Sequence, residues 1–143
     1  MKNNLILLVE DNHLDEILTL RSLAQGKVDN VTHVVRDGQE ALDYLFYEGL
    51  YADRPIGNPE IILLDLGLPK VDGAEVLKKI RSHESTKLIP VIILTASKEE
   101  DDKARSFKDG ANRYMEKPVN TDLFNKTMQE FLLYWVKLNK DFV

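Results

Sequence analysis

Short apolar runs of strand length alternate along this chain with longer segments in which apolar residues recur at helical spacing. The runs Leu5–Val9, Ile61–Leu64 and Ile89–Leu94 carry no polar side chain. A strand that is buried on both of its faces has this composition, whereas a strand with one solvent-exposed face alternates apolar and polar residues. The pattern therefore predicts an α/β fold in which helices cover both faces of a parallel sheet.

Two weaker strands and several helices complete the expected pattern. Val31–Val35 is less apolar than the three runs above, which places it nearer an edge of the sheet, and Asn112–Met115 is a further short strand. Helices are expected over Leu14–Ala24, over Gln39–Tyr47, along the face formed by Ala74, Val76, Leu77 and Ile80, over Lys98–Lys108, and from Asn120 to about Lys137. Gly110 fits a helix stop, and Asn120 fits a helix N-cap. Because crossovers between parallel strands are right-handed, few topologies remain, and a flavodoxin-like, doubly wound (βα)5 sheet of strand order 2-1-3-4-5 is predicted.

Composition and charge exclude several classes of protein. The 143 residues suffice for one domain with a full core, so residues 1–143 are expected to form a single domain with an extended C-terminal helix. The net charge of −5 and the absence of any Lys/Arg run argue against DNA binding. The lack of cysteine excludes disulfides and suits a reducing compartment. No apolar run reaches the length of a membrane span, and the N-terminal one is too short for a signal peptide, so a cytoplasmic location is expected.

Polar residues that can do chemistry follow four of the expected strands. Glu10 and Asp11 follow the first strand, Asp65 the third, Thr95 the fourth and Lys117 the fifth. In a sheet of order 2-1-3-4-5, ligands bind where the strand order reverses, between the first and third strands. Three carboxylates that meet there would repel one another, and a hard cation such as Mg²⁺ relieves that repulsion. Asp65 can then act as a carboxylate nucleophile towards a phosphoryl group, which the Lys117 charge and the Thr95 hydroxyl would bind.

Each of these residues has an ordinary explanation when it is taken alone. An acidic pair after a strand is a common helix N-cap, Asp65 could cap a loop, and Lys117 could be a solvated surface charge. Thr95 could be an ordinary residue at the end of a strand. The prediction of a site rests on all of them falling at the same edge of the sheet in the right order.

The segments that hold these residues resemble the receiver domain of bacterial two-component response regulators. They read LLVEDN at 7–12, LLDLGLPKVDG at 63–73, VIILTAS at 91–97 and DGANRYMEKP at 109–118. The resemblance implies that Asp65 accepts a phosphoryl group from a sensor histidine kinase, with Mg²⁺ or Mn²⁺ as the cofactor. It makes Glu10 and Asp11 the acidic metal pair, with Asp11 the direct ligand, and the backbone carbonyl of Gly67 a further ligand.

The same resemblance assigns a switch and a peptide isomer. Thr95 is the hydroxyl that binds the phosphoryl group, and Lys117 pairs with that group. A proline, Pro118, follows Lys117, and their peptide bond is cis in the family. Tyr114 falls at the position of an aromatic residue that rotates inward when Thr95 moves.

Two features narrow the resemblance to the small regulators that serve cyanobacterial and bacterial phytochrome kinases. These features are the Gly- and Pro-containing segment 48–60, expected as a long surface loop, and the extended last helix. No length remains for a DNA-binding or enzymatic output domain, so output is expected through protein–protein interaction.

The last helix contains an apolar run, Phe131–Val136. Successive helical residues turn by about 100°, so this run covers every direction around the helix axis. Only one face can pack on the sheet, and exposed apolar patches often mark partner sites. We therefore expect a symmetric homodimer through the fourth and fifth strands and the last helix, with Tyr114, Phe131, Tyr134 and Trp135 in the interface. The alternative is that the tail folds back over its own domain.

Proteins of other functions share parts of this sequence pattern. A phosphatase with an aspartyl nucleophile keeps a second acidic residue two positions after the nucleophile. Gly67 stands there, so no enzyme is expected beyond self-phosphorylation and autodephosphorylation. A degenerate receiver would lack the acceptor that this chain retains. A chemotaxis-type motor switch regulator, which the long loop and tail disfavour, and a phosphorelay intermediate remain alternatives.

Overall fold

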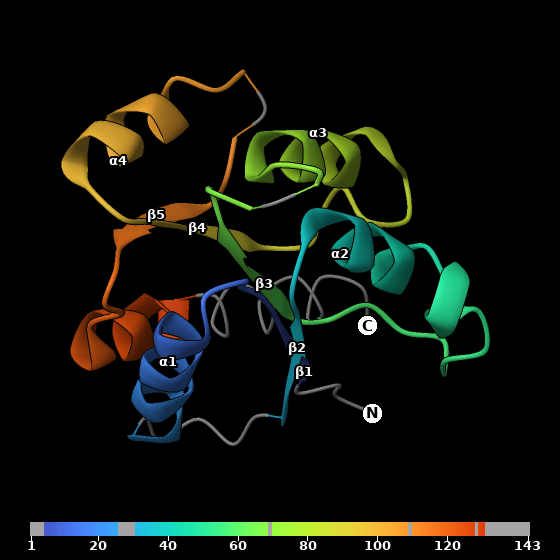
Figure 1. The fold of residues 1–143 in the computed structure, drawn as a ribbon, viewed down its shortest axis with the longest axis horizontal. Helices are drawn as coiled ribbons and strands as arrows, with labels where there is room; N and C mark the ends of the chain where they lie inside the picture. Colours follow the sequence, from blue (N-terminus) through green and yellow to red (C-terminus); the bar gives the residue numbers. More distant parts are fainter. Residues whose placement is uncertain (1–4, 26–30, 69, 109, 128, 131–143) are drawn as a thin grey trace.

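The computed structural model describes residues 5–25, 31–68, 70–108, 110–127 and 129–130 of the chain. Its strands form one parallel sheet in the order β2-β1-β3-β4-β5 (Figure 1). They are β1 Leu5–Val9, β2 Val31–Val35, β3 Ile61–Asp65, β4 Val91–Thr95 and β5 Arg113–Glu116. This is the strand order predicted from the sequence, and β2 lies at an edge as expected.

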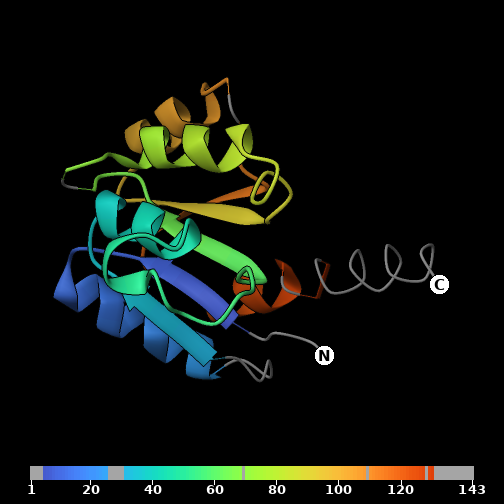
Figure 2. The same ribbon diagram turned by 90° about the vertical axis from the view of Figure 1, so that its right-hand side faces the viewer.

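Helices cover both faces of the sheet. They are α1 His13–Gln25, α2 Gly38–Leu45, α3 Gly73–Ser82 and α4 Lys98–Arg105, with a 3₁₀ turn, η1, over Gly49–Tyr51. Residues 121–127 are helical as well, and the Asn120 side chain accepts a hydrogen bond from the Leu123 N–H at 2.9 Å, which confirms Asn120 as an N-cap. Figures 1 and 2 show α2, α3 and α4 on one face, and α1 with the 121–127 segment on the other. None of the helices in the described part of the chain is long and apolar enough to cross a membrane.

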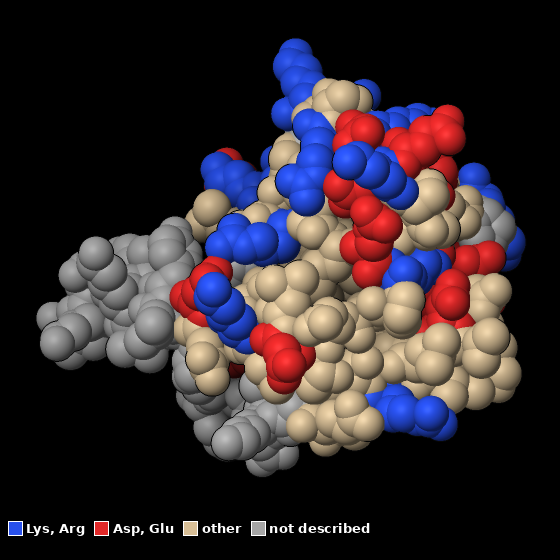
Figure 3. Space-filling model, turned by 90° about the vertical axis from the view of Figure 1, so that its left-hand side faces the viewer, with Lys and Arg blue, Asp and Glu red and all other residues tan. Residues whose placement is uncertain are grey.

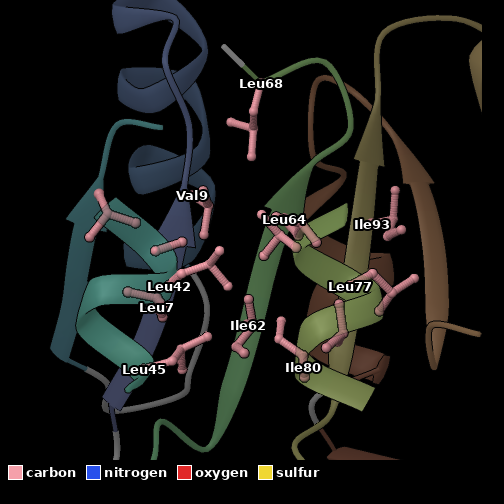
Figure 4. Packing of buried hydrophobic residues seen from close by; sticks show 14 of the residues in the cluster. Leu7, Val9, Leu42, Leu45, Ile62, Leu64, Leu68, Leu77, Ile80 and Ile93 are labelled. Atoms are coloured by element: carbon pink, nitrogen blue, oxygen red, sulfur yellow. The ribbon is translucent and has the colours of Figure 1, made fainter. Parts of the chain in front are cut away.

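Alternate residues of the central strands build two cores, one on each face of the sheet. Leu7, Ile62 and Leu64 belong to the core beneath α2 and α3, where Figure 4 shows Leu42, Leu45, Leu77 and Ile80 packed against them. Leu8 and Leu63 belong to the core on the other face, together with Leu23 of α1 and Phe124. Burial on both faces is the reason that these strands contain unbroken apolar runs.

Some element bounds differ from those predicted. The fourth helix ends at Arg105 rather than Lys108, because the Ser106 N–H already bonds back to the carbonyls of Lys103 and Ala104. Gly110 therefore lies in the connection to β5 and is not the helix stop. The fourth strand begins at Val91 rather than at Ile89, whose N–H bonds to Thr86 O at 3.0 Å in a turn.

The segment 48–60 is packed more closely than a surface loop is expected to be. The Tyr51 ring contacts the rings of Tyr44 and His33, with centroids 5.0 and 5.5 Å away. The Arg54 guanidinium lies 4.0 Å from the centroid of the Tyr44 ring and 4.1 Å from that of Tyr47. These contacts fix the segment against α2 and the edge strand β2.

An ion pair joins α1 to the end of β2 and gives a stability prediction. Arg36 donates hydrogen bonds to both carboxylate oxygens of Glu16, whose side chain is only 10% exposed. These bonds hold the pKa of the Glu16 carboxyl below its ordinary value of 4.5. Arg36→Met is expected to lower the free energy of unfolding at pH 7 by more than the loss of an exposed ion pair does, because it leaves the buried Glu16 carboxylate without this donor.

The pH dependence of that loss follows from the depressed pKa of Glu16. The pair's contribution is fully present above pH 4.5 and is lost as the pH falls through the lower pKa of the folded state. Urea unfolding of wild type and Arg36→Met at pH 7 and pH 3 should show the difference shrinking in acid. Lys87→Met, which removes an exposed pair with Glu84, is the control and should change stability by less than about 0.5 kcal/mol. A difference that does not vary with pH would contradict the role given to Glu16.

Candidate functional site

The carboxyl ends of β1 and β3 bring three acidic side chains together. Val9 pairs with Leu64 in the sheet, so the residues that follow, Glu10 and Asp65, stand side by side. Carboxylate oxygens of Glu10, Asp11 and Asp65 all lie within 4.8 Å of one another. Glu10 and Asp65 are buried, whereas Asp11 is exposed. The sequence predicted this meeting from the strand order alone.

Lys117 reaches this cluster from the far side of β4. Its Nζ atom lies 3.3 Å from Asp65 Oδ2, 3.2 Å from Glu10 Oε1 and 2.8 Å from Asp15 Oδ2. The Lys117 backbone N–H donates to Thr95 O at 2.7 Å, which continues the ladder past the end of β5. The peptide bond between Lys117 and Pro118 is cis, the isomer that the resemblance implies.

Burial and mutual contact set the charges in the site. Burial raises the pKa of Glu10 to about 8, and contact with Asp65 adds to the rise while Lys117 opposes it. Burial works against the charged form of Lys117, yet its contacts with Asp15, Asp65 and Glu10 raise the pKa of the ammonium above its ordinary value. The site therefore holds a charged lysine beside a glutamate whose charged form is disfavoured by burial.

The turn after β3 folds back onto the candidate acceptor. The Gly67 N–H donates to Asp65 Oδ1 at 3.2 Å. Asp72 caps α3 by accepting from the Glu75 N–H at 3.0 Å, and Gly73 lies directly over β3, where an added Cβ would stand 2.7 Å from the Asp65 carbonyl oxygen. The start of α3 is thus held against the backbone that carries the candidate acceptor. The role of the Gly67 carbonyl as a metal ligand stays a prediction.

The two candidate switch residues lie on paired strands. Thr95 ends β4, is fully buried and donates from Oγ1 to Met115 O at 3.4 Å. Tyr114 of β5 pairs with Ile93 of β4 and is partly buried. Its hydroxyl accepts a hydrogen bond from the Ala111 N–H at 3.2 Å. The Arg105 guanidinium of α4 lies 4.9 Å from the centroid of the Tyr114 ring.

Sequence reasoning missed one residue of the site, and three of the residues that it predicted for an interface are not described by the structure. Asp15, the nearest carboxylate to Lys117, was not among the predicted site residues. Its signal in the sequence is its place four residues after Asp11, which puts it in the first turn of the helix that begins beside the site. The predicted interface residues Phe131, Tyr134 and Trp135 lie outside the described residues.

The donor set fits a hard divalent cation. Glu10, Asp11 and Asp65 offer carboxylate oxygens, which Mg²⁺ and Mn²⁺ both accept, and the cluster contains no soft ligand. A cation at these oxygens would also favour the charged form of Glu10, which burial and the contact with Asp65 disfavour.

Known proteins with similar sequences and structures point the same way. Response regulator Rcp1 of Synechocystis sp. is 41% identical over 133 residues, which span 92% of this chain and 88% of Rcp1. The Mn²⁺-bound form of Rcp1 matches this fold with a TM-score of 0.72, at 39% identity over 92% of this chain and 94% of that one. Bacteriophytochrome response regulator RtBRR matches with a TM-score of 0.85, at 47% identity over 91% of this chain and 78% of RtBRR.

A further structure is that of a phosphorylated protein, and the family profile covers most of the chain. The phosphorylated cyanobacterial phytochrome response regulator RcpA has a TM-score of 0.74 and 40% identity, over 94% of this chain and 95% of RcpA. The response regulator receiver domain matches residues 6–129. The chain therefore belongs to the response regulator receiver domain family, whose members are signalling proteins rather than classical enzymes.

Proposed function

We propose that this chain is a phosphorylation-switched signalling module in which Asp65 accepts a phosphoryl group from a sensor histidine kinase. The observation that carries the proposal is the position of Asp65 at the end of β3. It is buried, lies within 4.8 Å of Glu10 and Asp11, and stands 3.3 Å from the Lys117 ammonium. A carboxylate nucleophile, a set of hard oxygen ligands and a fixed positive charge are the parts that phosphoryl transfer to an aspartate requires.

The residues of the chain divide the work as follows. An oxygen of Asp65 forms the new bond to phosphorus, while the donor's bond to phosphorus breaks and the donor keeps the electron pair. Lys117 offsets the charge on the phosphoryl oxygens, and Thr95 offers a hydroxyl donor from the adjacent strand. Glu10 and Asp11 would hold Mg²⁺, or Mn²⁺, which supplies charge neutralisation at the phosphoryl oxygens when it is bound.

The donor class is proposed from the relatives. Rcp1 and RcpA are response regulators, RcpA of a cyanobacterial phytochrome, and RtBRR is a bacteriophytochrome response regulator. We take the phosphodonor of this chain to be a phytochrome-type histidine kinase, and its output to be binding to other proteins. A cytoplasmic location is part of the same proposal.

The output surface is proposed around α4 and β5. Figure 3 shows charged side chains of both signs crowded over the upper part of this side of the molecule, where α4 lies. Tyr114 lies on β5 beneath Arg105, and a movement of Thr95 towards the phosphoryl group would free space on the Tyr114 side. This switch is the part of the proposal that links Asp65 to a surface.

A symmetric homodimer through β4, β5 and the last helix is part of this output. Analytical ultracentrifugation at tens of micromolar should show a dimer in at least one of the two states, phosphorylated or unphosphorylated. Tyr134→Ala and Trp135→Ala should shift the protein towards monomer, because they remove aromatic area from the proposed interface. A monomer under both conditions would rule the dimer out.

The central test is phosphorylation by a small donor. Incubation with Mg²⁺ and acetyl phosphate, followed by intact mass measurement, should show one phosphoryl adduct. Chelation of the cation should suppress the adduct, because the carboxylate cluster would then lack the charge that admits a phosphoryl group. No adduct with any donor, including a histidine kinase, would defeat the proposed function.

A further inference from the structure

Lys117 has one carboxylate partner more than the proposed chemistry uses. Two of its partners, Glu10 and Asp65, belong to the cluster that would hold the cation. The third, Asp15, is the nearest at 2.8 Å and is not part of that cluster as found in the described part of the chain. An ammonium group has three donors, so all three contacts can exist at the same time.

A divalent cation on Glu10 and Asp65 conflicts with this position of Lys117. The ammonium already lies 3.2 Å from Glu10 Oε1 and 3.3 Å from Asp65 Oδ2, so both cations would share the same carboxylates. Like charges a few ångströms apart repel strongly where solvent is excluded, and the Lys117 side chain is only 11% exposed. Lys117 therefore needs a partner that the cation does not use.

Asp15 lies where such a partner is needed. It stands in the first turn of α1, where its own N–H donates to Asn12 Oδ1 at 2.9 Å. Its side chain is 30% exposed, compared with 0% for Glu10 and 6% for Asp65. A partly exposed carboxylate at 2.8 Å can hold the ammonium from the solvent side without entering the buried cluster.

We propose that Asp15 is a positioning residue that holds the Lys117 ammonium on the α1 side of the site and so leaves Glu10 and Asp65 able to bind a divalent cation. The inference rests on the proposed function only for the identity of the metal site, and it does not depend on phosphoryl transfer. It is a statement about cation affinity, which can be measured with no phosphodonor present.

A double-mutant cycle on Mg²⁺ affinity tests this role. Calorimetric titration of the full chain would compare wild type, Asp15→Asn, Lys117→Met and the double variant. Asp15→Asn should weaken Mg²⁺ binding by roughly three- to tenfold more in the wild-type background than in the Lys117→Met background. The cycle subtracts the direct attraction between Asp15 and the cation, because that attraction is removed in both backgrounds. Lys117→Met alone should tighten Mg²⁺ binding. Asp15→Glu, which keeps a carboxylate at this position, should bind Mg²⁺ with nearly the wild-type affinity.

Two controls separate this role from damage to the fold. Asp53→Asn makes the same change of charge in the segment between α2 and β3, at the opposite edge of the sheet, and should change Mg²⁺ affinity by less than about twofold. Thermal unfolding should show that each variant is folded. If Asp15→Asn does not fold, Asp15→Ser, which also removes the charge, takes its place.

The outcomes distinguish the inference from the proposed function. An equal loss of affinity in both backgrounds would overturn the inference, because Asp15 would then act only as a nearby charge. If wild type binds no divalent cation, the inference and the metal site both fail. A phosphoryl adduct without coupling between Asp15 and Lys117 would overturn the inference and leave the acceptor in place.

Discussion

Asp65→Asn is expected to reduce phosphoryl incorporation by at least about 100-fold, to below detection by intact mass. The amide is a poor nucleophile and offers one oxygen where the carboxylate offers two. Among the described residues, the other carboxylates of the cluster, Glu10 and Asp11, extend from β1. Neither stands at the end of β3, where it could replace Asp65. The measurement is the mass of the intact chain after incubation with acetyl phosphate and Mg²⁺.

The fold should survive this substitution. Lys117 keeps Glu10 and Asp15 as partners, and one of three clustered carboxylates is neutralised. Without divalent cations, the free energy of unfolding of Asp65→Asn is therefore expected to stay within about 1 kcal/mol of wild type, or to rise. The matched control Asp53→Asn should form the adduct at the wild-type level. A full adduct on Asp65→Asn would mean that another residue is the acceptor.

Gly73→Ala is expected to lower the free energy of unfolding by about 2–4 kcal/mol. An added Cβ would stand 2.7 Å from the Asp65 carbonyl oxygen, 2.8 Å from Leu66 Cα and 2.9 Å from the Leu66 carbonyl oxygen. All three atoms belong to the backbone at the end of β3, which cannot move aside without disturbing its pairing with β4. The Gly73 N–H also donates to Leu66 O at 3.1 Å, so α3 cannot shift outward without losing that bond.

Urea unfolding followed by circular dichroism measures this effect, with Gly110→Ala as the matched control. A Cβ at Gly110 would meet no atom within 4 Å, so the control should change stability by less than about 1 kcal/mol. The folded fraction of Gly73→Ala should also accept a phosphoryl group more slowly, because relief of the contact displaces the strand end that carries Asp65. Wild-type stability in Gly73→Ala would contradict the close packing of α3 on β3.

The contacts that could not be predicted are those between residues that are not neighbours in the chain, because no local sequence pattern marks them. The Asp15–Lys117 contact joins residues 102 positions apart, at 2.8 Å, and each residue alone has the composition of a solvated surface group. The packing of Arg54 between Tyr44 and Tyr47 is similar, because Gly and Pro in that segment predict a loop and say nothing of the rings that fix it. Helix ends were also missed where the bonds of one backbone N–H decide them, as at Ser106.

The amino-acid sequence predicted the parallel sheet, its strand order and the meeting of Glu10, Asp11 and Asp65 at one edge. It could do so because burial on both faces demands unbroken apolar strands, and because parallel strands end at the same edge with their next residues side by side. The identity of the carboxylate nearest to Lys117, and the close approach of α3 to β3, could be seen only in the folded chain. Those outcomes depend on differences of a few tenths of an ångström in the distances between segments far apart in the chain, which the packing of the whole domain sets.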